Sequence, residues 1–88
     1  MLEREIVINN ESGLESKAAA MLIQKASGYA SNIWIEKNAR RANAKSLLGI
    51  LSLGVSKGEK VLLIADGADE SLALNELELF ANRGMSNE

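Results

Sequence analysis

In 88 residues the chain passes through seven short segments, each with the residue pattern of a helix or a strand. Three repeat their apolar residues every three to four positions, which is typical of helices, and four are short, turn-bounded runs typical of strands. We expect strands at 2–9, 32–37, 40–44 and 59–65, and helices at 16–27, 45–54 and 70–83. The order βαββαβα predicts an α+β domain with one antiparallel sheet covered on one face, although it also fits a ferredoxin-like fold with an extra helix.

The second helical segment, 45–54, carries more apolar side chains than a short helix can bury. Ser46 is a preferred N-cap residue and Gly54 a natural C′ residue, so the helix between them has few turns. Its apolar residues extend most of the way around the helix: Leu47, Leu48, Ile50, Leu51 and Leu53. We therefore expect part of this helix to face the core and part to remain exposed as an apolar surface.

Two missing residue types exclude most catalytic chemistry. The chain has no cysteine and no histidine, so it offers no thiol nucleophile, no imidazole base and no usual zinc ligand. We expect no enzymatic activity, no metal site and no cofactor. A net charge of -2 does not favour nucleic acid or anionic membranes. No transmembrane run or secretory signal is evident, which predicts a cytoplasmic protein with a single domain over 1–88.

Three segments carry recognisable motifs: GLESKAAA at 13–20 followed by LIQKAS at 22–27, NAKSLLGILSLGV at 43–55, and DGADE at 66–70. Together they resemble the HPr family of small phosphocarriers of the bacterial sugar phosphotransferase system. The first is similar to the family's first helix, the second to the segment carrying its regulatory serine, and the third to the entry of its last helix. The resemblance implies an HPr-like open-faced β-sandwich, a four-stranded antiparallel sheet with three helices on one face.

The chain departs from the family at the phosphocarrier motif. Glu15 holds the position of the phosphorylated histidine, Lys17 that of the arginine and Ala18 that of the proline. Phosphoryl relay needs a nucleophile whose phosphorylated form keeps a high transfer potential, which imidazole provides. A phosphohistidine carrier is therefore excluded. Loss of the histidine with retention of the serine segment resembles the Crh type of HPr-like regulator of carbon catabolite repression.

This resemblance implies that Ser46 is phosphorylated by HPr kinase/phosphorylase. The phosphorylated protein would then bind a LacI-type transcription regulator similar to catabolite control protein A. We assign the partner surface to Leu47, Leu48 and Leu51 of the serine helix together with Lys17 and Lys45. Without the resemblance Ser46 would be interpreted only as an N-cap, and the leucines as core residues.

Two other functions remain open. Glu15, otherwise a helix N-terminal acid, could act as a fixed negative charge in a binding module that docks on a metabolic or phosphotransferase-system enzyme without phosphorylation. Alternatively, Glu15 could itself carry phosphate as an acyl phosphate. Lys17 is a cation in the first helical turn, and it could contact a partner or the phosphorylated serine. Exchange of the first strand between two copies would give a homodimer, which the sequence permits but does not require.

Overall fold

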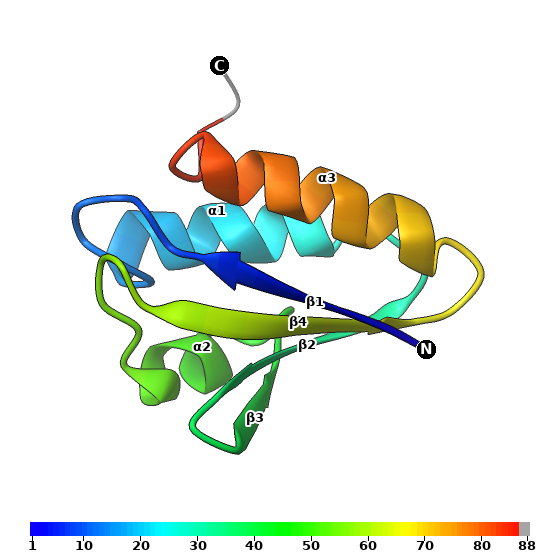
Figure 1. The fold of residues 1–88 in the computed structure, drawn as a ribbon, viewed down its shortest axis with the longest axis horizontal. Coiled ribbons are helices and arrows are strands. Elements are labelled where there is room, and N and C mark those ends of the chain that lie inside the picture. The colour runs from blue at the N-terminus through cyan, green and yellow to red at the C-terminus, as the bar shows by residue number, and fades with distance from the viewer. Residues whose placement is uncertain (87–88) are drawn as a thin grey trace.

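The computed structural model describes residues 1–86 and shows the predicted order of strands and helices (Figure 1). The four strands form one antiparallel sheet in the spatial order β1-β4-β2-β3. The elements are β1 (Leu2–Val7), α1 (Ser16–Ala26), β2 (Asn32–Lys37), β3 (Arg40–Asn43), α2 (Leu47–Leu53), β4 (Lys60–Asp66) and α3 (Glu70–Asn82). The α+β prediction is confirmed, and the expected boundaries differ from these by at most two residues.

All three helices lie on one face of the sheet, as predicted. The register sets Arg4, Leu63, Ile35 and Ala42 in one row across the four strands, and these four side chains therefore share a face. At one end of the row Arg4 donates to Asn75 of α3, and at the other end Ala42 lies against α2. Figure 1 shows α1 and α3 running alongside each other above the strands.

The core lies between this face and the helices. The alternation along 2–9 predicts that Leu2, Ile6 and Ile8 face inward, and the structure buries Ile6 and Ile8 but leaves Leu2 39% exposed at the start of β1. The inner face predicted for the last helix is buried, with Ala73, Leu77, Phe80 and Ala81 all in the core. Arg4 interrupts the inner row of the first strand, and its charge is satisfied by pairing with α3. Its guanidinium lies 2.6 Å from the Asn75 Oδ1 atom and 3.2 Å from a Glu78 carboxylate oxygen. A partly exposed ion pair of this kind contributes little stability beyond fixing the helix against the edge strand.

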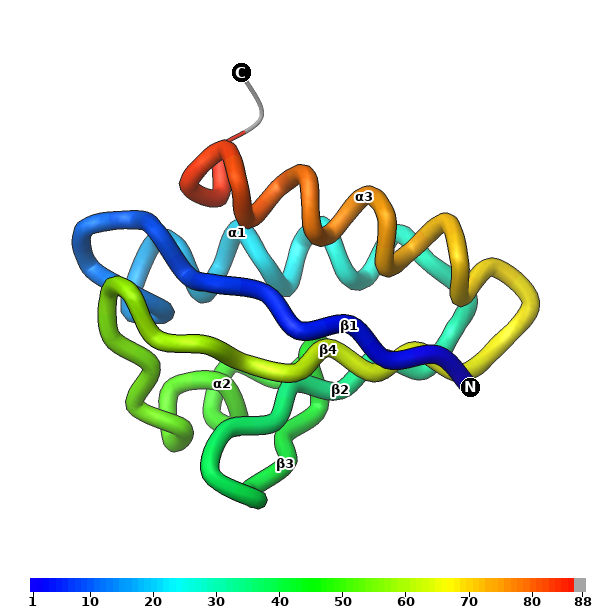
Figure 2. Tube along the Cα trace, in the orientation of Figure 1, coloured from blue at the N-terminus to red at the C-terminus, as the bar shows by residue number. Residues whose placement is uncertain are grey.

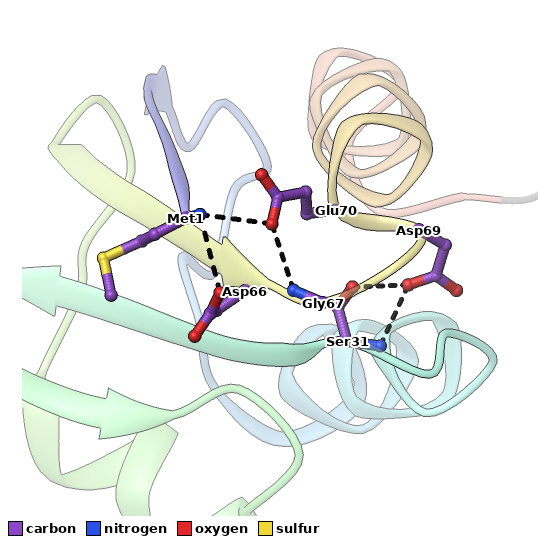
Figure 3. A network of polar contacts seen from close by, with 6 residues as sticks. All are labelled: Met1, Ser31, Asp66, Gly67, Asp69 and Glu70. Atoms are coloured by element: carbon purple, nitrogen blue, oxygen red, sulfur yellow. Dashed lines mark hydrogen bonds and ion pairs between the residues drawn. The ribbon is translucent and has the colours of Figure 1, made fainter.

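The loop between α1 and β2 is held against the start of α3 by Asp69 (Figure 3). Asp69 precedes α3 as predicted, but its carboxylate does not cap that helix. It accepts hydrogen bonds from the Ala30 and Ser31 N–H groups and from the Ser31 hydroxyl. The hydroxyl bond in particular lowers the pKa of Asp69 below its usual range. The position directly before the helix predicts an N-cap, but the Asp69 side chain makes a tertiary contact instead of a capping hydrogen bond.

The turn before α3 also contacts the start of β1. The Met1 ammonium lies 3.5 Å from Asp66 and 3.2 Å from Glu70, and the Glu70 carboxylate accepts from the Gly67 N–H (Figure 3). Gly67 is needed here because a Cβ would lie 2.7 Å from the Ser31 Cα atom. The trace in Figure 2 shows this turn and the α1–β2 loop side by side.

Candidate functional site

Ser46 is the N-cap residue of α2, as the sequence predicts. Its backbone is extended, and its hydroxyl oxygen accepts a hydrogen bond from the Gly49 N–H at 3.3 Å. The Ser46 carbonyl accepts from the Ile50 N–H at 3.0 Å, which closes the first helical turn. The residue is half-buried, so part of it faces solvent beside the helix. At the other end Gly54 ends the helix in the left-handed conformation, with φ of 64°.

A tight turn connects β3 to Ser46. The Ala44 N–H still pairs with the Ile33 carbonyl of the neighbouring strand at 2.9 Å. Asn43 then holds the turn twice, because its carbonyl accepts from the Ser46 N–H and its side chain accepts from the Lys45 N–H. Asparagine favours such turns because its side chain can take the place of a backbone acceptor. The backbone at Ser46 is therefore set by local hydrogen bonds.

Lys45, assigned above to the partner surface, has an internal role in the structure. Its ammonium group donates to the Tyr29 carbonyl at 2.9 Å and to the Ser31 carbonyl at 3.0 Å. The side chain is half-buried as a consequence. These bonds join residues 14 and 16 positions apart, so no local pattern could have indicated them. A contact with a partner would have to compete with both bonds.

The α2 helix divides its apolar residues between core and solvent. Leu48 is 81% exposed, Leu47 46% and Leu51 41%, and these three form what we call the leucine surface. Ile50 and Leu53 are buried on the opposite side. The helix can lie close to the sheet because a Cβ at residue 49, which is glycine, would be 3.2 Å from the Ala42 Cβ. The predicted division of this helix is confirmed, with its exposed part directly after Ser46.

The degenerate phosphocarrier residues lie at the start of α1. Glu15 is exposed at the N-cap position, and its side chain makes no capping hydrogen bond. Ser16 follows with φ of 43°, in the region that side chains other than glycine rarely adopt. Ala18 is buried in the core cluster. Lys17 is exposed and borders a hollow of about 460 Å³ whose lining also includes Asn10, Ser12, Ala18, Met21, Gly84 and Met85.

The structure does not join this site to Ser46. The helices α1 and α2 pack together. Even so, within residues 1–86 no hydrogen bond or ion pair links Glu15 or Lys17 to Ser46. Lys17 borders the hollow beside the end of α3, and no residue of α2 contributes to its lining. The idea that Lys17 pairs with a phosphorylated serine therefore stays a prediction that these contacts do not support.

Sequence reasoning missed the polar contacts around the α1–β2 loop. Tyr29 is buried, and its hydroxyl donates to the Glu76 carboxylate at 2.5 Å. Burial, together with this carboxylate, raises the pKa of the Tyr29 phenol. Tyr29 and Glu76 lie 47 residues apart in the sequence, so only folding brings them together. No helix within residues 1–86 is long and apolar enough to cross a membrane.

The family is decided by the comparison with known proteins. The family model described as "PTS HPr component phosphorylation site" matches residues 2–83 of this chain. The chain belongs to the HPr family. The resemblance that its helix segments suggested is therefore confirmed, and so is the HPr-like fold.

The relatives include both types of HPr protein. The HPr-like protein Crh of Bacillus subtilis is 38% identical over 80 residues, covering 91% of this chain and 94% of the relative. The solved structure of HPr-C-His from Thermoanaerobacter tengcongensis matches with a TM-score of 0.95 and 43% identity, over 100% of this chain and 99% of the other. A Bacillus subtilis Crh structure described as a domain-swapped dimer gives a TM-score of 0.76 and 36% identity, over 96% and 97%. Similarity alone therefore does not choose between carrier and regulator.

Proposed function

We propose that this chain, as a single HPr-like domain, is a regulatory protein of carbon catabolite repression. An HPr kinase/phosphorylase phosphorylates Ser46, and the phosphorylated protein binds a LacI-type regulator similar to catabolite control protein A. The main support is the geometry of α2, where a half-exposed N-cap serine directly precedes the leucine surface. The relative Crh, named in one solved structure as a catabolite repression protein, gives independent support.

The residue at position 15 argues against the carrier function of the family. A carboxylate stands where relay of phosphate requires an imidazole, and the chain has no histidine elsewhere. Transfer of phosphate from phosphoenolpyruvate through Enzyme I to Glu15 would leave a hydroxylamine-sensitive acyl phosphate. We expect no phosphate to be transferred to Glu15 when the protein is incubated with phosphoenolpyruvate and Enzyme I.

Phosphate on Ser46 would change the charge of a surface without rebuilding the helix. The group adds about -1.5 to -2 charge at pH 7. At most, the helix loses the 3.3 Å hydrogen bond that the Gly49 N–H donates to the Ser46 side-chain oxygen, while the Ile50 N–H keeps its backbone acceptor. A partner could then recognise the phosphate and the leucine surface together. Basic residues of the partner would bind the phosphate, and an apolar groove of the partner would bind the leucines. DNA would be contacted by the partner only.

The decisive experiment is intact-mass spectrometry after incubation with HPr kinase/phosphorylase and ATP. We expect one added phosphate on the wild type and none on Ser46→Ala. An HPr of the ordinary type, run in parallel, shows that the kinase is active. An unmodified wild type in the presence of active kinase would refute the proposal.

Binding to the regulator forms the second step. We expect phosphorylated protein to bind a catabolite control regulator and unphosphorylated protein to bind weakly. Leu48→Ala should weaken binding of the phosphorylated form. Leu72→Ala is the matched control, because Leu72 is 53% exposed but lies on α3 and not on the helix that Ser46 caps. Equal loss with both variants would argue against docking through the leucine surface.

A second function, docking without phosphorylation, is favoured by the exposed carboxylate of Glu15. Among the described residues no hydrogen bond or ion pair engages that carboxylate, so its charge is available to a partner. We expect such a target, for example an enzyme of the phosphotransferase system, to bind wild type and Ser46→Ala equally. Glu15→Gln would weaken that binding. If Ser46→Ala alone abolished binding, this second function would be excluded.

Self-association is also part of the proposal. The relative Crh is described as a swapped dimer, and β1 is an edge strand here, contacting only β4 within the sheet. Exchange of β1 between two copies would keep the same register with β4. Sedimentation equilibrium would show a mass that rises with concentration if the chain dimerises. A constant monomer mass would exclude it.

A further inference from the structure

Lys45 directly precedes the proposed phosphorylation site, Ser46. The Lys45 side chain reaches the α1–β2 loop. The ammonium group lies 2.9 Å from the Tyr29 carbonyl oxygen and 3.0 Å from that of Ser31. Hydrogen bonds from an ammonium group to carbonyl oxygens are stronger than bonds between neutral groups. The loop and the turn before α2 are therefore tied by one side chain.

The same loop is held from its other side by an opposite charge. The Asp69 carboxylate accepts from the Ala30 N–H at 2.8 Å and from the Ser31 N–H at 2.9 Å. Lys45 thus binds the carbonyl groups of the loop, and Asp69 binds its N–H groups. Ser31 is 1% exposed, and the turn at Gly67 approaches it closely. The loop is therefore held by hydrogen bonds from both Lys45 and Asp69.

The geometry points to Lys45 as a positioning residue for the Ser46 hydroxyl. We propose that the Tyr29–Ser31 loop, held by Asp69, anchors Lys45, and that this tether controls how Ser46 is presented to a kinase. The inference rests on the proposed function, since it concerns phosphorylation of the same serine. It differs from a partner contact, because Lys45 acts here through the backbone of its own chain. Loosening the loop should then affect Ser46 without altering the leucine surface.

The tether can be tested without any kinase. We compare Lys45→Met with Lys60→Met, which removes a charge from a side chain 67% exposed on β4. Amide hydrogen exchange is followed by NMR at Gly49, which donates to Ser46, and each rate is referred to the global stability of its variant. We expect Lys45→Met to raise Gly49 exchange about tenfold and Lys60→Met to leave it unchanged. Unchanged exchange at Gly49 in Lys45→Met would overturn the tether.

Kinase kinetics separate positioning from contact. If docking uses the leucine surface, a misplaced hydroxyl lowers kcat while KM stays near the wild-type value. We expect Lys45→Met to lower kcat about tenfold, and Asp69→Asn to lower it less, because Asp69 acts through the loop. A raised KM with unchanged kcat in Lys45→Met, and no effect of Asp69→Asn, would make Lys45 a partner contact and overturn the inference.

The two failures can be told apart. If the active kinase does not label the wild type, the proposed function fails. The exchange measurement, which needs only the protein itself, then still decides whether Lys45 orders the Ser46 turn. If the wild type is labelled and kcat of Lys45→Met equals that of the wild type, the positioning role is refuted and the proposed function stands.

Discussion

Replacing Ser46 by alanine removes the side-chain cap of α2 and leaves the leucine surface in place. An N-cap serine typically stabilises a protein by about 0.5–2 kcal/mol relative to alanine. The bond from Gly49 is 3.3 Å long and the serine is half-buried, so we place this case at about 0.5–1 kcal/mol. The Ile50 N–H keeps its bond to the backbone at residue 46, and the helix should therefore persist.

The lower stability of Ser46→Ala can be measured by urea unfolding. The transition is monitored by circular dichroism and by fluorescence of Trp34, the only tryptophan. With a slope of about 1 kcal/mol/M, the midpoint of Ser46→Ala should fall by about 0.5–1 M. Ser46→Asn should keep most of the stability, because asparagine also caps well. Ser52→Ala is the control within the same helix, since the exposed Ser52 hydroxyl donates to the Gly49 carbonyl and takes no part in the N-cap.

An alanine variant as stable as the wild type would refute the assigned cap, as would an asparagine variant no better than alanine. The size of the effect also matters for the kinase experiment. A domain of this size has a stability of several kcal/mol, so Ser46→Ala stays folded. Failure to label that variant would then reflect the missing hydroxyl and not unfolding.

Three further tests concern other parts of the structure. Leu48→Ala should leave the urea midpoint nearly unchanged because Leu48 is 81% exposed, whereas Ile50→Ala, two residues on and buried, should cost about 2–5 kcal/mol; similar midpoints would contradict the orientation of α2. Tyr29→Phe should lower the free energy of unfolding by about 1 kcal/mol, since it removes the hydroxyl bound to Glu76, and a more stable variant would exclude that bond. The pKa of Asp69 is lowered in the folded state, so its contribution is present above the ordinary value and is lost as the pH falls through the lower folded value. Urea midpoints between pH 6 and pH 2 should therefore fall less steeply for Asp69→Asn than for wild type, and parallel curves would refute this linkage.

The elements and their order could be predicted from the sequence alone. Helical and strand patterns depend on side-chain spacing along one segment, and so they are visible without the fold. The N-cap at Ser46 and the left-handed Gly54 are likewise local, because each depends on backbone groups a few residues away. The excess of leucine in α2 also predicts an exposed surface. The absence of histidine excludes a phosphohistidine carrier whatever the fold, because no arrangement of the chain can supply the missing imidazole.

Local patterns could not reveal contacts between distant segments. The position of Asp69 directly before α3 predicts a cap for that helix. Folding instead brings the Ala30 and Ser31 N–H groups within 2.9 Å of the carboxylate, and both donate hydrogen bonds to it. Lys45 neighbours Ser46 in sequence, which by itself predicts a place on the partner surface.

The position of the Lys45 ammonium group depends on the folded arrangement of distant segments. Lys45 lies in the turn before α2, next to the α1–β2 loop. Two carbonyl oxygens of that loop accept hydrogen bonds from its ammonium group. A lysine ammonium group needs hydrogen-bond acceptors, and the nearest ones in space can belong to distant parts of the sequence. The residues next to Lys45 in the sequence therefore do not reveal them. The site around Ser46 is therefore local in its cap and tertiary in its support.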